Sequence, residues 1–361
     1  MSVCKVLSFI SIATEPNQVR VCKALANLAA VYLFHRIRVS ADMRPEFDAD
    51  RLSLLSRSLG HHVRTFIFAL PAVPWDFQRA RLPNYVALIL PYLPNIRCLV
   101  IGCDAWNTVS DSVIINAIAK LQHLEWVTFS ALGNKPIDAI YSPSSPTFFE
   151  TCFNKILSSH AERLTSLSLA ACPLHCAPGT FQLLRGTMKN LQALNLNRSL
   201  PKSLWDVFAQ PLTWACADRL VMLDVTDIHT DYVPILVEHI ASGRFGNLKR
   251  LHIQIYWTDR NRNIMIPSIE WNIRPLETLV LTEVPRQELG ILGCLHAKEV
   301  HLVGVPELAV IELVRGGCFK EMAVLEIWQG VSDYIRLEEL ASACASRNVQ
   351  IAMSNSLLNV T

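Results

Sequence analysis

The sequence predicts an α/β solenoid, in which short parallel strands form a sheet and helices cover its other side. Three observations support this prediction. A frame of apolar residues, apolar-x-x-apolar-x-apolar, recurs along the 361 residues of the chain. Its copies follow one another at a near-regular interval, and segments with helical periodicity lie between them. Together these features indicate one repeated strand–helix unit.

About eleven irregular copies of the frame are present. The clearest begin at residues 164, 191, 220, 248 and 276, and others begin at 34, 63, 96, 124, 297 and 322. The intervals between first positions are 29, 33, 28, 40, 27, 29, 28, 28, 21 and 25 residues. Repeats of about 20–29 residues are typical of solenoids with one strand and one helix per unit. The interval of 40 contains a Pro- and Ser-rich segment, so we expect a loop insertion at about residues 133–147.

Each frame predicts a strand whose two sides differ. Alternate side chains of a strand point to opposite faces, so positions four and six enter the core while positions five and seven face away from it. The frame Ser346-Val349-Ile351 predicts a closing strand. Between the strands, residues 111–121, 233–240 and 337–344 have the apolar spacing of helices. Strand, helix and strand in one direction predict a parallel sheet.

Composition excludes several classes of protein. Hydrophobic residues make up 51% of the chain and charged residues 18%, which argues against disorder. The net charge is +2, from 33 Lys and Arg against 31 Asp and Glu, so we expect neither nucleic acid nor a membrane as a partner. The eleven cysteines form no C-x-x-C pair, which favours reduced thiols and a cytoplasmic or nuclear location.

The sequence contains few residue patterns that point to catalysis or metal binding. The chain has no G-x-G-x-x-G, P-loop, G-x-S-x-G or H-E-x-x-H motif. Cys172, His175 and Cys176 come nearest to a zinc cluster, but no fourth ligand is near in sequence. His61 and His62 are adjacent, so on a strand they would point to opposite faces and not chelate together. We therefore expect no enzyme, no cofactor and no metal site.

A protein-binding surface is predicted on the face of the sheet opposite the helices, at positions five and seven. These positions are small and apolar in the N-terminal half and polar or aromatic in the C-terminal half. Tryptophan and tyrosine are typical anchors of protein interfaces. The residues expected to contact a protein target are Asn195, Asp224, Thr226, His252, Gln254, Tyr256, His301, Glu326 and Trp328.

Other residues near the strand ends leave alternatives open. Trp106 and Trp257 contact either a partner or the edge of a neighbouring repeat, and the polar run at residues 259–263 is either a binding loop or a solvated one. Outside complexes we expect a monomer.

The frame resembles the leucine-rich-repeat family of the longer, ribonuclease-inhibitor-like type, which implies a horseshoe with the sheet on its concave face. The family frame adds Asn or Cys at position nine, and here only Cys172 matches. This departure predicts irregular turns in place of a regular asparagine ladder, and the curvature cannot be predicted from it.

The residues before the first repeat resemble the second half of an F-box, as in fungal-style F-box/leucine-rich-repeat proteins. The matching parts are Val21-Cys22-Lys23, the small-residue helix at 24–30 and residues 32–37, but no Leu-Pro-x-Glu start occurs in residues 1–16. The resemblance implies a Skp-type adaptor as partner and a substrate-recognition subunit of a cullin-type ubiquitin ligase. We expect a helical cap at 1–33 and a repeat domain at 34–361. The alternative is a free-standing repeat scaffold whose N-terminal segment only caps the first repeat.

Overall fold

The computed structural model describes residues 35–40, 57, 60–69, 86, 89–102, 112–130, 154–170, 183–197, 214–256, 274–328 and 337–354. The chain divides into two compact units, residues 1–134 and 135–361. The boundary lies in the segment predicted to be a Pro/Ser loop, which is outside the described residues, as is the predicted N-terminal cap at 1–33. Both units combine parallel strands with helices, which confirms the α/β class.

The described residues of the first unit form four parallel strands in chain order. Its described elements are β1 (Arg36–Ser40), η1 (Gly60–His62), β2 (Thr65–Ala69), η3 (Leu90–Tyr92), β3 (Cys98–Gly102), α5 (Ser112–Ala119) and β4 (Trp126–Ser130).

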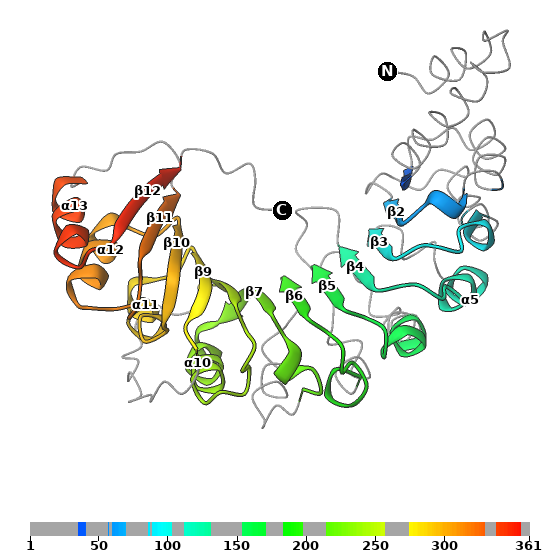
Figure 1. The fold of residues 1–361 in the computed structure, drawn as a ribbon, viewed down its shortest axis with the longest axis horizontal. Helices are drawn as coiled ribbons and strands as arrows, with labels where there is room; N and C mark the ends of the chain where they lie inside the picture. Colours follow the sequence, from blue (N-terminus) through cyan, green and yellow to red (C-terminus); the bar gives the residue numbers. More distant parts are fainter. Residues whose placement is uncertain are drawn as a thin grey trace, which may run out of the picture. The chain divides into compact units, whose positions relative to one another are not determined.

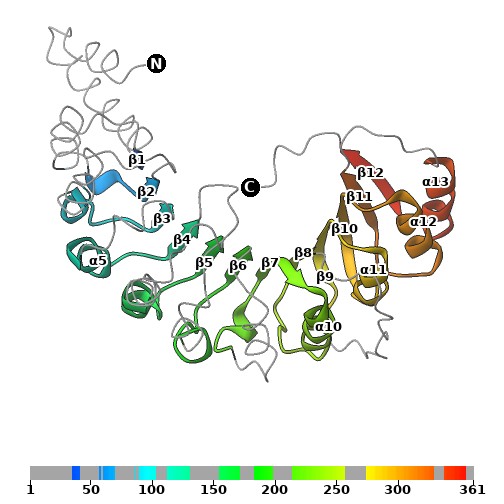
Figure 2. The ribbon, with the colours of Figure 1, turned by 180° about the vertical axis from the view of Figure 1, so that it is seen from behind.

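In the second unit, the part of the chain that the structure describes repeats this pattern over eight parallel strands, again in chain order. The strands are β5 (Ser166–Ala170), β6 (Ala193–Asn197), β7 (Met222–His229), β8 (Arg250–Tyr256), β9 (Leu276–Thr282), β10 (Ala297–Val303), β11 (Val324–Trp328) and β12 (Gln350–Ser354). The helices are η6 (Ala217–Arg219), η7 (Thr230–Tyr232), α10 (Val233–Ala241), α11 (Arg286–Leu292), α12 (Glu307–Arg315) and α13 (Leu337–Ser346). Helices α10 to α13 lie on the same side of their sheet (Figures 1 and 2).

The strands fall where the frame predicts them. Eleven copies coincide with β1 to β11, and position four of one strand pairs with position four of the next, as Leu194, Leu223 and Leu251 do. The closing strand is displaced by two residues from the prediction. Leu325 pairs with Ile351, so the last frame begins at Asn348 and not at Ser346. Side chains alternate along a strand, so a displacement of two residues leaves the same side chains pointing toward the core. The apolar pattern therefore cannot distinguish the two positions of the strand.

Helices predicted at 111–121, 233–240 and 337–344 are confirmed as α5, α10 and α13, with ends that differ by at most two residues. Glycine ends helix α12: Gly317 has φ +74°, and the N–H of Cys318 donates to the carbonyl of Leu313 at 3.1 Å. A left-handed residue followed by this long-range bond is the Schellman arrangement, which satisfies a carbonyl of the last turn and turns the chain toward β11.

The core lies between the strands and the helices. Positions one, four and six supply it, as shown by Leu220, Leu223 and Val225, which are at most 1% exposed. A fully buried Leu or Val side chain contributes about 1.5–3 kcal/mol, so this repeated triplet is the main source of stability.

Backbone hydrogen bonds link successive repeats at the start of most described strands. The carbonyl at position two of a repeat accepts two hydrogen bonds, from the amides of positions two and three of the next repeat. The carbonyl of Gln192, for example, accepts from Val221 at 2.8 Å and Met222 at 2.9 Å, and that of Val221 accepts from Lys249 and Arg250. Because these bonds use only backbone atoms, register is kept although the side chains at position two vary.

An asparagine feature also links successive repeats. Asn95, Asn190 and Asn247 stand immediately before position one of their frames, and the side-chain amide of each donates to a carbonyl two residues before position one of the preceding repeat. The acceptors are His61 at 2.8 Å, Glu162 at 2.5 Å and Asp218. The sequence prediction considered asparagine at position nine and, with Asn195, on the binding face, and it missed this set.

Candidate functional site

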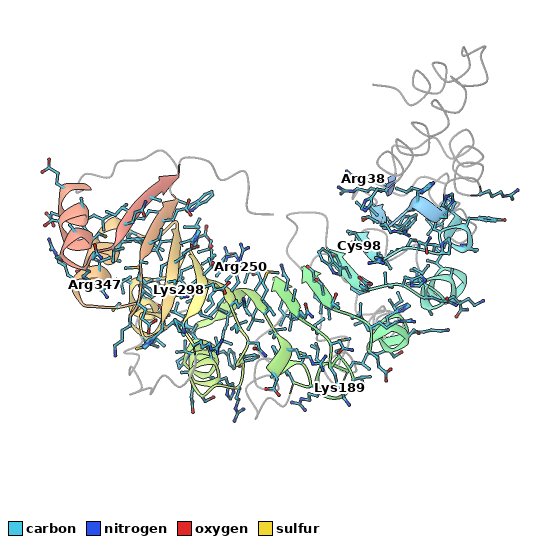
Figure 3. The ribbon with its side chains drawn as sticks, viewed as in Figure 1. Arg38, Cys98, Lys189, Arg250, Lys298 and Arg347 are labelled. Atoms are coloured by element: carbon cyan, nitrogen blue, oxygen red, sulfur yellow. The ribbon has the colours of Figure 1, made fainter. Side chains whose placement is uncertain are left out.

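The side of the sheet opposite the helices carries the predicted binding residues. We call the surface formed by positions three, five and seven of β7 to β11 the open face. Side chains are shown in Figure 3, where Arg250 on β8 is labelled. Position five holds Asp224, His252, Val280, His301 and Glu326; position three holds Met222, Arg250, Thr278, Glu299 and Val324; position seven holds Thr226, Gln254, Thr282, Val303 and Trp328.

A chain of polar contacts crosses four adjacent strands. The amide of Asn195 donates to Oδ2 of Asp224 at 3.0 Å, and Oδ1 of Asp224 lies 3.0 Å from Nδ1 of His252. Nε2 of His252 lies 3.0 Å from the hydroxyl of Thr282. The side chains of Asp224 and His252 are 20% and 21% exposed, so the contacts are partly shielded from water. Register alone places three of these residues side by side, because Asn195, Asp224 and His252 all occupy position five.

A second histidine lies between two carboxylates. Nδ1 of His301 is 2.9 Å from Oε2 of Glu326, and Nε2 is 3.8 Å from Oε2 of Glu299. A neutral imidazole donates from only one nitrogen, whereas the protonated ring donates from both. The sequence prediction named His301 and Glu326 but omitted Glu299, because it assigned only positions five and seven to the face. The alternation of the strand would have placed Glu299 there.

Asp224, His252 and Thr282 have the atom order of a catalytic triad: carboxylate, imidazole Nδ1, imidazole Nε2 and hydroxyl. Acyl transfer also needs donors aimed at the developing oxyanion. The amide that follows the hydroxyl, that of Glu283, donates to the carbonyl of Val303 at 2.8 Å and so is already engaged. The contacts therefore fit a polar link between strands better than a nucleophile.

The remaining predicted residues differ in how much accessible surface and hydrogen-bonding capacity they present to a partner. Gln254 donates to Oε2 of Glu283 at 2.9 Å at the end of β9, and both are accessible. Thr226 is only 4% exposed, so it presents almost no surface. Tyr256 ends β8, where its backbone pairs with His229. Trp328 is half-buried, and its indole Nε1 has no hydrogen-bond partner among the described residues.

In the first unit, the corresponding strand face contains an exposed tryptophan. Trp126 at position three of β4 is 55% exposed and pairs in register with Cys98 of β3. Position five of β2 and β3 holds Ile67 and Val100, which agrees with the small, apolar character expected of this half. The sequence prediction missed Trp126 for the same reason that it missed Glu299.

The expectation that His61 and His62 point to opposite faces is wrong. They lie in the 3₁₀ helix η1 and not on a strand, and their ring centroids are 3.7 Å apart. Partial burial lowers the pKa of His62, and the charges of His61 and Arg64 lower it further. Within the described part of the chain, no group of three or more His, Cys, Asp or Glu could hold a metal ion.

The five described cysteines, Cys98, Cys216, Cys294, Cys318 and Cys344, are free thiols. Burial is the main influence on each, and it raises the pKa of Cys216 to about 11. A thiol with a raised pKa stays protonated at neutral pH and is a poor nucleophile and metal ligand. These residues therefore act as small apolar side chains.

Several predicted features lie outside the described residues: the cluster of Cys172, His175 and Cys176, the tryptophans at 106 and 257, and the polar run at 259–263. Among the described residues, no helix has the length and apolar character needed to cross a bilayer. No protein-family model matches the chain, and no curated protein matches it.

Proposed function

We propose that this chain is a leucine-rich-repeat protein of the F-box type that binds a protein target on its open face and serves as a substrate-recognition subunit of a cullin-type ubiquitin ligase. The sheet would then be the concave face of a horseshoe. Support comes from the apolar frame, whose copies lie in register on parallel strands with helices on the other side. The F-box part rests on the sequence resemblance at residues 19–37.

The observation that carries target binding is the chemistry of position five. Its side chains do not enter the core, yet they are held in defined positions by contacts between strands, as Asp224 is by Asn195 and His252. Side chains that are already ordered lose little entropy when a partner binds, so a surface of this kind is preorganised for recognition.

A free-standing repeat scaffold without an adaptor is the alternative. The residues before the first frame would then form only the helical cap that a solenoid requires.

Co-expression with a Skp-type adaptor separates the two proposals. We expect the full chain to co-purify with the adaptor, and Leu25→Asp with Leu28→Asp in the predicted small-residue helix to abolish co-purification. Glu312→Gln, a substitution on the exposed surface of α12, is the matched control and should leave co-purification unchanged. Failure of the folded, unmodified chain to retain the adaptor would reject the ligase role and favour the scaffold.

Target binding has its own test. Replacing His252, His301 and Trp328 together by alanine should reduce the proteins that co-purify with the chain from cells, as measured by quantitative mass spectrometry. Retention of the adaptor and of the circular dichroism spectrum would show that the variant is folded. Undiminished capture by the folded variant would reject the open face.

A further inference from the structure

The open face carries more acidic than basic side chains. Asp224, Glu299 and Glu326 lie on it, and Glu283 follows β9 at its end. Among the described residues of β7 to β11, Arg250 is the one lysine or arginine at positions three, five and seven. The chain as a whole has a net charge of +2, so this local excess of carboxylates is a property of the face and not of the composition.

Neighbouring lysines do not cancel this excess. Lys249 stands at position two, where it forms an ion pair with Glu277 at 2.9 Å. Lys298, labelled in Figure 3, alternates with the open-face residues and so lies on the same side of β10 as Val300 and Leu302. It is exposed because it stands at the start of the strand. The carboxylates of the open face are therefore contacted mainly by histidines, which carry a full charge only when protonated.

The acidic groups flank an apolar centre. Along position five the order is Asp224, His252, Val280, His301 and Glu326 on five adjacent strands. Val280 is 6% exposed, so the small surface that the centre presents at position five is apolar. Adjacent strands are about 4.8 Å apart, which places the two carboxylate ends about 19 Å from each other.

The carboxylates leave hydrogen-bond acceptors on this surface. A carboxylate accepts up to about four hydrogen bonds. Glu299 is 53% exposed and its contact with His301 is long, at 3.8 Å, so its oxygens are open to a donor. Arginine and lysine form the strongest hydrogen bonds with carboxylates, and arginine can do so through two parallel bonds.

From this arrangement we propose that the open face binds a polypeptide segment with basic side chains on both sides of an apolar one. The apolar side chain covers Val280, and the basic side chains reach Asp224 on one side and Glu299 with Glu326 on the other. This inference rests on the proposed function of the open face as a protein-binding surface and specifies the partner. An extended segment that crosses the strands covers about 19 Å in about six residues, since each residue adds about 3.3 Å.

Selection from a phage-displayed library of random dodecapeptides against the full chain tests the proposal. We expect the selected peptides to be enriched in Lys and Arg around a central apolar residue. A face variant combines Asp224→Asn, Glu299→Gln and Glu326→Gln. The control variant combines Glu238→Gln, Glu312→Gln and Glu339→Gln on exposed positions of α10, α12 and α13, and so changes the net charge equally.

Fluorescence anisotropy with a selected basic peptide then compares the three proteins. The face variant should bind at least about tenfold more weakly, while the control variant should stay within about twofold of the unmodified chain. If the face variant does not fold, Glu299→Gln alone should still weaken binding. Raising the ionic strength from about 50 to about 300 mM should also weaken binding to the unmodified chain, since salt screens accessible charges.

Selected peptides of neutral or acidic composition, or basic peptides that bind the face variant as well as the control, would overturn this inference and leave the protein-binding face in place. If the folded chain selects no peptide above background, this inference fails, whereas target binding by the open face is decided by the co-purification test of the triple variant. The adaptor experiment is independent of either result.

Discussion

Neighbouring residues of the same strands face two different environments. Position four of β7 to β11 lies on the side that the helices cover, and its side chains are 0% exposed: Leu223, Leu251, Leu279, Val300 and Leu325. Position five, one residue further along, holds four polar side chains and a valine. The two-residue period of a strand therefore separates the residues that stabilise the fold from those available for binding.

Carboxylates on the two sides of the sheet also have different surroundings. On the open face, Oδ1 of Asp224 and Oε2 of Glu326 each lie within 3.0 Å of a histidine nitrogen, although Oδ1 of Asp224 makes no hydrogen bond of regular geometry among the described residues. On the helix side, Glu288 of α11 is 3% exposed, and its Oε2 has no hydrogen-bond partner among the described residues. Substitutions on either side should thus have effects of different size and sign.

Replacing Leu223 by alanine should have the largest effect. Removal of a fully buried leucine side chain loses its transfer free energy and leaves a cavity, which costs about 3 kcal/mol of unfolding free energy. Asp224→Ala, one residue further along, should cost about 1 kcal/mol or less because its side chain lies on the accessible side. Urea unfolding followed by circular dichroism measures both. Equal destabilisation would contradict the assignment of the two faces.

This difference between faces could be predicted from the sequence, and so could most of the fold. The frame placed eleven strands in register because only apolar residues suit positions one, four and six, and any slip by one residue would bury Asp224 or His252. The closing strand was misplaced because a slip by two residues keeps the parity unchanged.

The contacts of the binding surface could be predicted less well. The frame identified His301 and Glu326 on adjacent strands. It missed Glu299 and Trp126, which both occupy position three, because only positions five and seven were assigned to the binding face. The hydrogen bonds of Asn95, Asn190 and Asn247 depend on how successive repeats are placed. Each acceptor is a backbone carbonyl, which every residue type has, so the sequence does not reveal the acceptor. The pairing of His61 with His62 depended on a 3₁₀ helix, which short apolar patterns do not reveal.

Glu288→Gln should have a smaller effect, in the stabilising direction. Burial raises the pKa of Glu288, with a smaller opposing contribution from a backbone hydrogen bond. The folded state therefore binds the proton more tightly than the unfolded state, so its stability falls as the pH rises through the folded pKa. Glutamine has no such penalty, because it resembles the protonated acid.

We expect Glu288→Gln to raise the unfolding free energy by about 1 kcal/mol at pH 8, which is at the low end of the cost of a buried unsatisfied polar group. The gain should disappear at a pH below the unfolded pKa, where both states are protonated. Urea midpoints measured from pH 4 to pH 8 check this. A gain that does not change with pH would mean that packing, and not ionisation, is responsible.

The smallest effect concerns the histidine–carboxylate contact between His301 and Glu326 on the open face. A double-mutant cycle with His301→Ala and Glu326→Ala should give a coupling free energy of about 0.5–1 kcal/mol. The matched cycle uses Arg286→Ala and Glu312→Ala on α11 and α12. That pair is 2.5 Å apart but 69% and 51% exposed, against 23% and 22% for His301 and Glu326. Water screens exposed pairs and their long side chains lose entropy, so the coupling there should be below about 0.5 kcal/mol.

The ionic-strength dependence of the two cycles should differ in the same way, since salt screens partly buried pairs less than exposed ones. Equal coupling and equal salt dependence would mean that the strands do not shield the His301–Glu326 pair. In that case Glu326 would be fully hydrated before a partner arrives. It would then lose the preorganisation on which the proposed binding of basic side chains depends.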